Sequence, residues 1–219
     1  MAELKVGFVT FNPGSGNGDQ AVTVSGDKYK GRVKRSITTQ VATNDSSVQK
    51  QVVVNQSGVT EYVVIDETAS VAKGGGEVTI NGTSNSTKLT FSLAQDESHP
   101  LVLTIPENYT AAGKPTANGA AIADDPGATG EYQFSITFSG IAANTTVSNL
   151  ITNLTVTAAG GQSDSTVITQ TAGDPTLEVD KTVINLDAEG TAQTLNITSN
   201  TDWTISQVVS KMFKAMTGK

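Results

Sequence analysis

The residues that could carry acid–base or nucleophilic chemistry are few in this chain. His99 is the only histidine, and it stands in the polar stretch Asp96-Glu97-Ser98-His99-Pro100. A Ser-His-Asp triad would have to use it, yet no G-x-S-x-G nucleophile elbow occurs anywhere in the sequence. We therefore interpret His99 as a loop residue, predict no catalytic residue, and expect that the chain is not an enzyme.

A group of acidic residues in the middle of the chain could supply oxygen ligands to calcium. Asp124 and Asp125 precede Pro126-Gly127, and Glu131 follows shortly after. Calcium takes six to eight oxygens in a defined arrangement, and this spacing matches no known loop pattern. Asp-Pro-Gly is typical of a turn. We interpret the segment as a turn and expect no metal and no cofactor, with calcium binding as the alternative.

One short basic stretch interrupts an acidic chain whose net charge is −7. It contains Lys28, Lys30, Arg32, Lys34 and Arg35, and the two arginines are the only ones in the protein. One interpretation is an edge strand protected from aggregation by its charge. The other is an electrostatic dock for an acidic neighbour such as a capsid subunit. The overall acidity argues against a nucleic-acid partner.

Alternation of apolar and polar residues dominates the chain and predicts short, half-buried strands. Aromatic residues make up 5% of the chain and cysteine is absent, so several small cores without disulfides are expected rather than one large core. Glycine- and proline-rich turns separate the alternating segments. The pattern predicts an all-β fold of tandem immunoglobulin-like β-sandwich modules. Predicted strands include residues 6–11, 36–42, 101–105, 132–138 and 183–186.

Weak internal repeats predict where the modules begin and end. An apolar strand runs through Gln into Gly58 and again into Gly173. These signals predict an immunoglobulin-like module over residues 1–60, a second, larger module over 61–173, and a partial module over 174–206. A partial sandwich leaves a sheet edge and an apolar face uncovered. It either folds against the second module or is completed by another chain.

The end of the chain changes from strand spacing to helical spacing of its apolar residues. We predict an amphipathic helical tail over residues 207–219, which is marginal alone and must dock on something. It can pack on its own sandwich, enter a groove of a partner or of another copy, or lie on a membrane surface; we expect no membrane partner. The candidate assembly interface comprises Ile205, Val208, Val209, Met212, Phe213 and Met216.

The segment from Leu177-Glu-Val-Asp to Gly190-Thr-Ala-Gln-Thr-Leu-Asn-Ile-Thr-Ser-Asn-Thr-Asp-Trp203 resembles the BACON domain. That family is immunoglobulin-like and has a proposed carbohydrate-binding role. The closing Gln-to-Gly strands before Gly58 and Gly173 also look like the last strand of the family. Residues 174–206 lack the family's second half. We interpret Trp203 as a core plug rather than a platform for sugar stacking.

The resemblance implies a setting for the protein. BACON-like domains occur in secreted proteins of gut bacteria and in virion proteins of their phages. The N-terminus shows no secretory signal, so we expect a structural protein of a crAss-like phage, present in the virion and assembled in the host cytoplasm. It would serve as a capsid (head) decoration, head fibre or tail component whose partners are other virion proteins or itself as a homo-oligomer. The alternative is a carbohydrate-binding adhesin or accessory module with a host glycan as partner.

Overall fold

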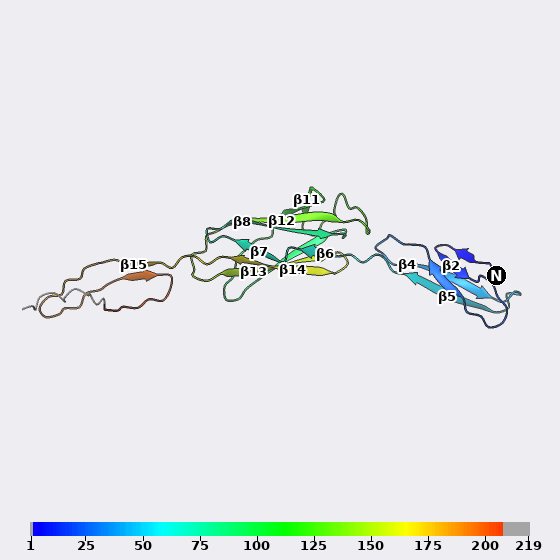
Figure 1. Ribbon diagram of the computed structural model, residues 1–219, viewed down its shortest axis with the longest axis horizontal. Coiled ribbons are helices and arrows are strands. Elements are labelled where there is room, and N and C mark those ends of the chain that lie inside the picture. The colour runs from blue at the N-terminus through cyan, green and yellow to red at the C-terminus, as the bar shows by residue number, and fades with distance from the viewer. Residues whose placement is uncertain (1, 208–219) are drawn as a thin grey trace, which may run out of the picture.

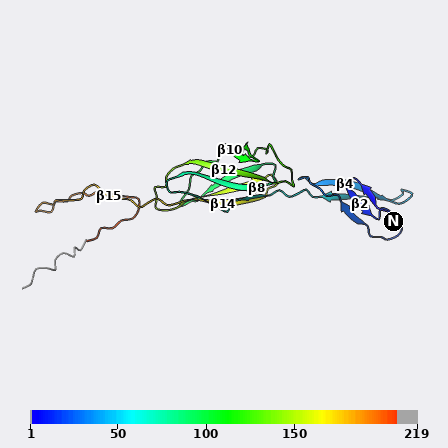
Figure 2. The ribbon, with the colours of Figure 1, turned by 45° about the horizontal axis from the view of Figure 1, so that its top comes forward.

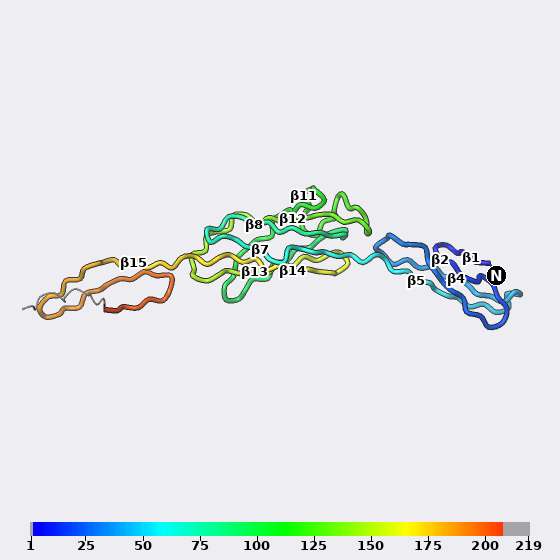
Figure 3. The backbone as a smooth tube through the Cα atoms, viewed as in Figure 1, coloured from blue at the N-terminus to red at the C-terminus, as the bar shows by residue number. Residues whose placement is uncertain are grey.

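The computed structural model describes residues 2–207, and these contain sixteen β-strands and no helix. Three parts follow one another along the longest axis: an N-terminal part (residues 2–60), a central sandwich (61–173) and a C-terminal hairpin (174–207) (Figure 1). The same order is seen in the turned view and in the backbone tube (Figures 2 and 3). The N-terminal part and the C-terminal hairpin thus lie at opposite ends of the central sandwich.

The N-terminal part consists of two small antiparallel sheets. Strands β1 (Leu4–Val6), β2 (Val9–Asn12) and β3 (Thr23–Gly26) form one sheet in that order. Strands β4 (Arg35–Ala42) and β5 (Gln49–Gln56) form a long hairpin, with Arg35 opposite Gln56 and Ala42 opposite Gln49. Gly7 joins β1 to β2 with a positive φ of 61°, which suits the tight connection between them. Val9 is the one fully buried large hydrophobic residue among the described residues of this part.

The central sandwich contains two sheets. One has the order β11-β10-β12-β8-β6 and the other the order β7-β14-β13-β9. Strand β6 pairs antiparallel with β8, whereas β7, which follows directly, pairs in parallel with β14 in the opposite sheet. The strands are β6 (Val63–Ile65), β7 (Thr68–Val71), β8 (Gly76–Ser84), β9 (Leu89–Gln95), β10 (Asn108–Ala111), β11 (Lys114–Ala117), β12 (Tyr132–Ile141), β13 (Leu150–Ala158) and β14 (Ser163–Gln170).

The main hydrophobic core lies between these two sheets. Alternate residues of β12, from Tyr132 to Phe138, point inward and are buried, as a half-buried strand requires. Phe91 of β9 packs edge-to-face on Tyr109 and Phe134, with ring centroids 4.7 and 6.0 Å apart. Of the 21 buried hydrophobic residues in the described part of the chain, 20 belong to the central sandwich. Packing therefore stabilises the centre far more than the two ends.

The C-terminal hairpin has little regular structure and no core of its own in the described residues. Strands β15 (Leu177–Val179) and β16 (Ile197–Ser199) pair antiparallel, and the residues between them form no further strand. Its large apolar side chains are exposed: Leu177, Val179, Val183, Ile184, Leu186, Trp203 and Ile205. It projects away from the central sandwich instead of folding onto it (Figure 1).

These observations confirm, for residues 2–207, an all-β fold with a β-sandwich. Three predicted strands differ in the structure. Residues 6–11 are not one strand, because the chain turns at Gly7 and Phe8 between β1 and β2. Residues 101–105 and 183–186 form no β-ladder within the described part of the chain. Leu101 is nevertheless buried, so the alternation at 101–105 reflects packing on the core without a β-ladder. The predicted tail over 207–219 lies, apart from Gln207, outside the described residues. No described segment forms a helix long and apolar enough to cross a membrane.

Candidate functional site

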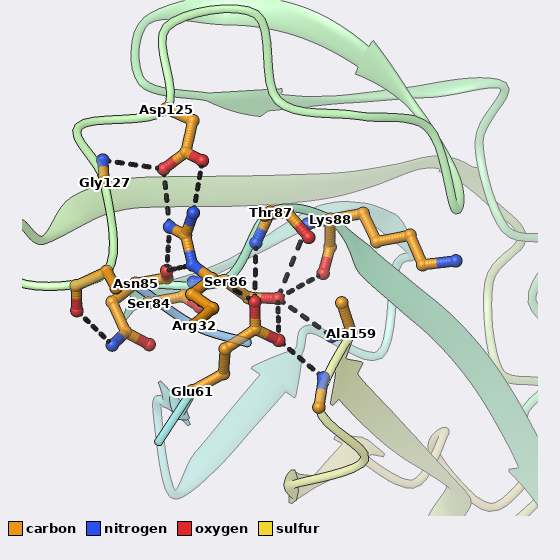
Figure 4. Close-up of polar contacts among 12 residues, drawn as sticks. Arg32, Glu61, Ser84, Asn85, Ser86, Thr87, Lys88, Asp125, Gly127 and Ala159 are labelled. Carbon is orange, nitrogen blue, oxygen red and sulfur yellow. Dashed lines mark hydrogen bonds and ion pairs between the residues drawn. The ribbon is translucent and has the colours of Figure 1, made fainter. Parts of the chain in front are cut away.

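The junction between the N-terminal part and the central sandwich is held by one arginine side chain. Arg32 donates two hydrogen bonds to the Asp125 carboxylate, Nη1 to Oδ2 at 2.7 Å and Nη2 to Oδ1 at 2.6 Å (Figure 4). Its Nε donates to the Asn85 carbonyl at 3.1 Å. The side chain is 16% exposed. This paired geometry is the strongest form of arginine–carboxylate contact.

A second carboxylate completes this junction cluster. Glu61 lies 3.2 Å from Arg32 Nε and is 7% exposed. Its oxygens accept hydrogen bonds from the Ser86 hydroxyl at 3.1 Å and from the backbone N–H groups of Thr87 and Gly160 (Figure 4). A buried carboxylate supplied with this many donors is well satisfied. A hollow of about 460 Å³ lies beside Glu61 and is also lined by Gly58. The Glu61 carboxylate is already engaged by its own hydrogen-bond donors, so it offers little to a ligand in this hollow.

Electrostatics at the junction match the geometry. The hydrogen bond from Arg32 holds the pKa of Asp125 below its ordinary value, and the same bond raises the pKa of Arg32. Gly127 N–H also donates to Asp125 Oδ1 at 2.9 Å, as in an Asx turn. Both groups are therefore charged at neutral pH, and the cluster is an ion pair that joins two parts of the chain.

The acidic group considered for calcium is divided among three different partners. Asp125 binds Arg32, and Asp124 forms an ion pair with Lys114 at 2.8 Å. Glu131 accepts a short hydrogen bond from the Tyr62 hydroxyl. The segment turns between Asp124 and Gly127, as its Asp-Pro-Gly sequence predicts. No group of three potential metal-ligating His, Cys, Asp or Glu residues occurs in residues 2–207.

His99 lies in an exposed loop after β9. Its backbone N–H donates to Asp96 Oδ1 at 2.8 Å, and its carbonyl accepts from the Ile151 N–H at 2.8 Å. These are backbone contacts that shape the loop, and they leave the imidazole outside any hydrogen bond within the described residues.

The basic stretch is divided between internal and exposed positions. The Arg35 guanidinium lies over the rings of Phe8, at 4.1 Å, and Tyr29, at 4.3 Å, and its Nε donates to Gln56. The acidic neighbours of Arg32 are Asp125 and Glu61 of its own chain. Three lysines of the predicted dock remain exposed: Lys28, Lys30 and Lys34.

Exposed apolar side chains are concentrated in the two terminal parts of the described chain. Among the described residues, 15 of the 19 exposed large hydrophobic residues belong to the N-terminal part or the C-terminal hairpin. Strands β3, β4, β5 and β16 each pair with a single neighbour there, so each has an unpaired edge. Unpaired edges beside exposed apolar side chains favour association with further strands.

The candidate assembly interface is described only in part. Ile205 is 78% exposed and belongs to no strand. Val208, Val209, Met212, Phe213 and Met216 lie outside the described residues. Trp203 is 48% exposed, so within the described chain it does not plug a core.

The sequence predicts neither the partners of Arg32 at the junction nor the exposed apolar side chains of the N-terminal part. Arg32 and Asp125 are 93 residues apart, and nothing in either local segment indicates the other. Val52 and Val53 of β5 are exposed, and apolar patterning does not say whether a second sheet covers such side chains. The incomplete length of residues 174–206 was the one signal of an open surface.

Comparison with known proteins adds no relative. A search of protein-family models finds none that matches this chain, and a search of curated proteins finds no match. The likeness to the BACON domain consequently rests on the residues quoted above.

Proposed function

We propose that this chain is a non-enzymatic structural protein of a virion, a head decoration, head fibre or tail component that acts through protein–protein assembly. The observation that carries the proposal is the contrast between a well-packed centre and two open, apolar β-surfaces at its ends. Exposed apolar surface next to unpaired strand edges is costly for an isolated molecule and typical of a part that acquires partners.

The proposal includes an immunoglobulin-like fold for the modules. In favour of it, the strand order β6-β8-β12-β10 and the opposing order β14-β13-β9 correspond to the ABED and GFC sheets of that fold. The position of the Gln-to-Gly endings agrees with repeated modules, since β5 ends at Gln56 and β14 ends at Gln170.

The virion setting, in a crAss-like phage, is supported by the resemblance of residues 174–206 to the BACON domain. A fold is shared by many functions, so the virion setting has a test of its own. It is tested by mass spectrometry of purified particles of the virus that encodes the chain, together with labelling of intact particles by an antibody raised against it. We expect a fixed number of copies per particle and labelling at one particle feature. Absence of the chain from washed particles would contradict the proposal.

One observation favours a second function, binding of a host glycan. The half-exposed indole of Trp203 could stack on a sugar ring. A glycan array would test this with the full chain and with Trp203→Ala. Binding that is lost in the variant would support an adhesin, whereas no binding by the full chain would exclude it for the sugars on the array.

A further inference from the structure

The C-terminal hairpin reproduces the hydrogen bonds of the first hairpin of the central sandwich. Between β6 and β8, Asn81 donates from its backbone N–H to Asp66 Oδ2 at 2.9 Å and from its amide at 3.3 Å. Between β15 and β16, Asn196 makes the same two bonds to Asp180, at 2.9 and 2.7 Å. In both hairpins the aspartate N–H returns a bond to the asparagine carbonyl, at 3.0 and 3.1 Å.

A second asparagine is duplicated at the other end of each hairpin. Asn85 Oδ1 accepts a hydrogen bond from the Tyr62 N–H at 2.8 Å, and the Asn85 amide donates to the carbonyl of Thr60, two residues before Tyr62. Asn200 Oδ1 accepts a hydrogen bond from the Thr176 N–H at 2.8 Å, and the Asn200 amide donates to the carbonyl of Asp174, two residues before Thr176. Therefore β15 and β16 are the structural counterparts of β6 and β8.

The N-terminal part ends in the same way as the central sandwich. Gln170, the last residue of β14, donates from its amide to the carbonyl of Ala142, which follows β12, at 2.8 Å. Gln56, the last residue of β5, donates to the carbonyl of Asp27, which follows β3, at 2.9 Å. Strands β3, β4 and β5 are thus the counterparts of β12, β13 and β14.

The two terminal parts lack complementary strands. In the central sandwich, β12 pairs with β8, β14 pairs with β7, and β13 pairs with β9. In the N-terminal part the corresponding edges of β3, β5 and β4 pair with no strand among residues 2–207. The C-terminal hairpin supplies the counterpart of β8 as β16, of β7 as residues 182–185, and of the start of β9 as the residues from Trp203. Within the described chain these segments have no partner across the sandwich.

We propose that the C-terminal hairpin of one copy completes the N-terminal part of a second copy as a single intermolecular sandwich. This inference rests on the proposed assembly function and names the partner as the chain itself. The central sandwich gives the register: Thr68 lies opposite Val167 and Ser70 opposite Thr169 in the β7–β14 pair. Thr182 and Ile184 take the places of Thr68 and Ser70, and Val53 and Asn55 take the places of Val167 and Thr169. At the interface, Thr182 of one copy would therefore lie opposite Val53 of the other, and Ile184 opposite Asn55.

Charge favours this pairing. Residues 1–60 contain seven Lys and Arg and four Asp and Glu, a net charge of +3. Residues 174–206 contain one Lys and six Asp and Glu, a net charge of −5. Opposite net charges steer the two surfaces together and oppose the pairing of like ends. The dock predicted at Lys28, Lys30 and Lys34 thereby gains an acidic partner in another copy.

Head-to-tail pairing uses different surfaces on the two copies, so it generates a ring or an open filament instead of a closed twofold dimer. The two parts lie at opposite ends of the central sandwich, which places the pairing between copies rather than within one (Figure 3).

The test mixes two full-length single variants, Val53→Cys and Thr182→Cys, and adds a short bis-maleimide cross-linker. The chain has no cysteine of its own, and neighbouring strands lie about 4.8 Å apart. Both sites are on exposed positions of the isolated chain. In the matched control, Thr182→Cys is mixed with Val64→Cys instead of Val53→Cys. Val64 is an exposed valine of β6 in the central sandwich. A second pair, Asn55→Cys with Ile184→Cys, tests the same register.

We expect cross-linked dimer from both head-to-tail pairs, at least tenfold above the Val64→Cys control. A yield no greater than the control from both pairs would overturn the proposal. Efficient cross-linking of Val53→Cys to itself, indicating a twofold dimer, would also overturn it. A negative result with the chain still present in virions would refute the head-to-tail pairing alone. Cross-linking of a chain absent from virions would refute the virion setting alone.

Discussion

Replacing Arg32 with alanine tests whether the junction is a structural ion pair. The change removes both hydrogen bonds to Asp125, the contact with Glu61 and the bond to the Asn85 carbonyl. It leaves two carboxylates at the surface of the central sandwich without their cation. The penalty therefore appears in the stability of the central sandwich, although the substitution is in the N-terminal part.

The size of the effect follows from the burial of the two carboxylates. Removing one partner of a buried ion pair costs about 3–5 kcal/mol. Asp125 is 23% exposed, and Glu61 keeps its three other donors, so solvent and these bonds reduce the cost. We expect a loss of about 2–3 kcal/mol. With a urea m-value of about 1–3 kcal/mol per M, the midpoint falls by roughly 0.7–3 M.

Urea denaturation at pH 7, followed by far-ultraviolet circular dichroism, measures this loss. Lys30→Ala is the matched control, because it removes an exposed cation two residues away. Surface changes of that kind stay within about 0.5 kcal/mol. An Arg32→Ala midpoint equal to that of Lys30→Ala would refute the reasoning.

The same ion pair predicts a dependence on pH. The hydrogen bond from Arg32 lowers the pKa of Asp125 below its ordinary value of 3.8. A carboxylate whose pKa is lowered by folding contributes stability above its unfolded pKa and loses it as the pH falls through the folded pKa. The difference between wild type and Arg32→Ala should therefore be full at pH 7 and shrink below about pH 4. A difference that stays constant down to pH 2.5 would contradict this account.

Two further predictions concern the core and the tryptophan. Ile136→Ala removes a side chain that is fully buried in β12, so we expect a loss of about 2–5 kcal/mol in urea denaturation, whereas Val64→Ala at an exposed position should change stability by less than about 0.5 kcal/mol. The emission of Trp203, the only tryptophan, should shift to shorter wavelength as protein concentration rises, because the half-exposed indole lies at the start of a segment that the head-to-tail pairing would use. An unchanged emission spectrum across a concentration range in which the mass grows would place Trp203 outside the interface.

Strands can be predicted where buried and exposed residues alternate along the sequence. Residues 132–138 are predicted as a strand and lie within β12, because every second side chain meets the core. The short strands β6, β7, β10 and β11 have three or four residues each, too few for a period to be recognised. At 101–105 the alternation reflects packing on the core, with one backbone hydrogen bond from the Leu101 N–H to the Ile151 carbonyl and no β-ladder.

Long-range pairing was not predictable from local pattern. Arg32 was noticed because arginine is rare here, yet its partners come from loops that are distant in sequence. The duplicated Asp66–Asn81 and Asp180–Asn196 bonds depend on strand register, which a single sequence does not specify.

The most direct test of assembly through the open β-surfaces is light scattering of the full chain across a range of concentrations, beside the variant Val183→Asp. Val183 is 71% exposed, so the substitution should leave the isolated chain folded while placing a charge in the interface. We predict that the mass of the wild type grows beyond a dimer with concentration and falls with added salt, and that Val183→Asp stays monomeric. A wild type that remains a monomer at every concentration, or a variant that assembles equally well, would contradict the account.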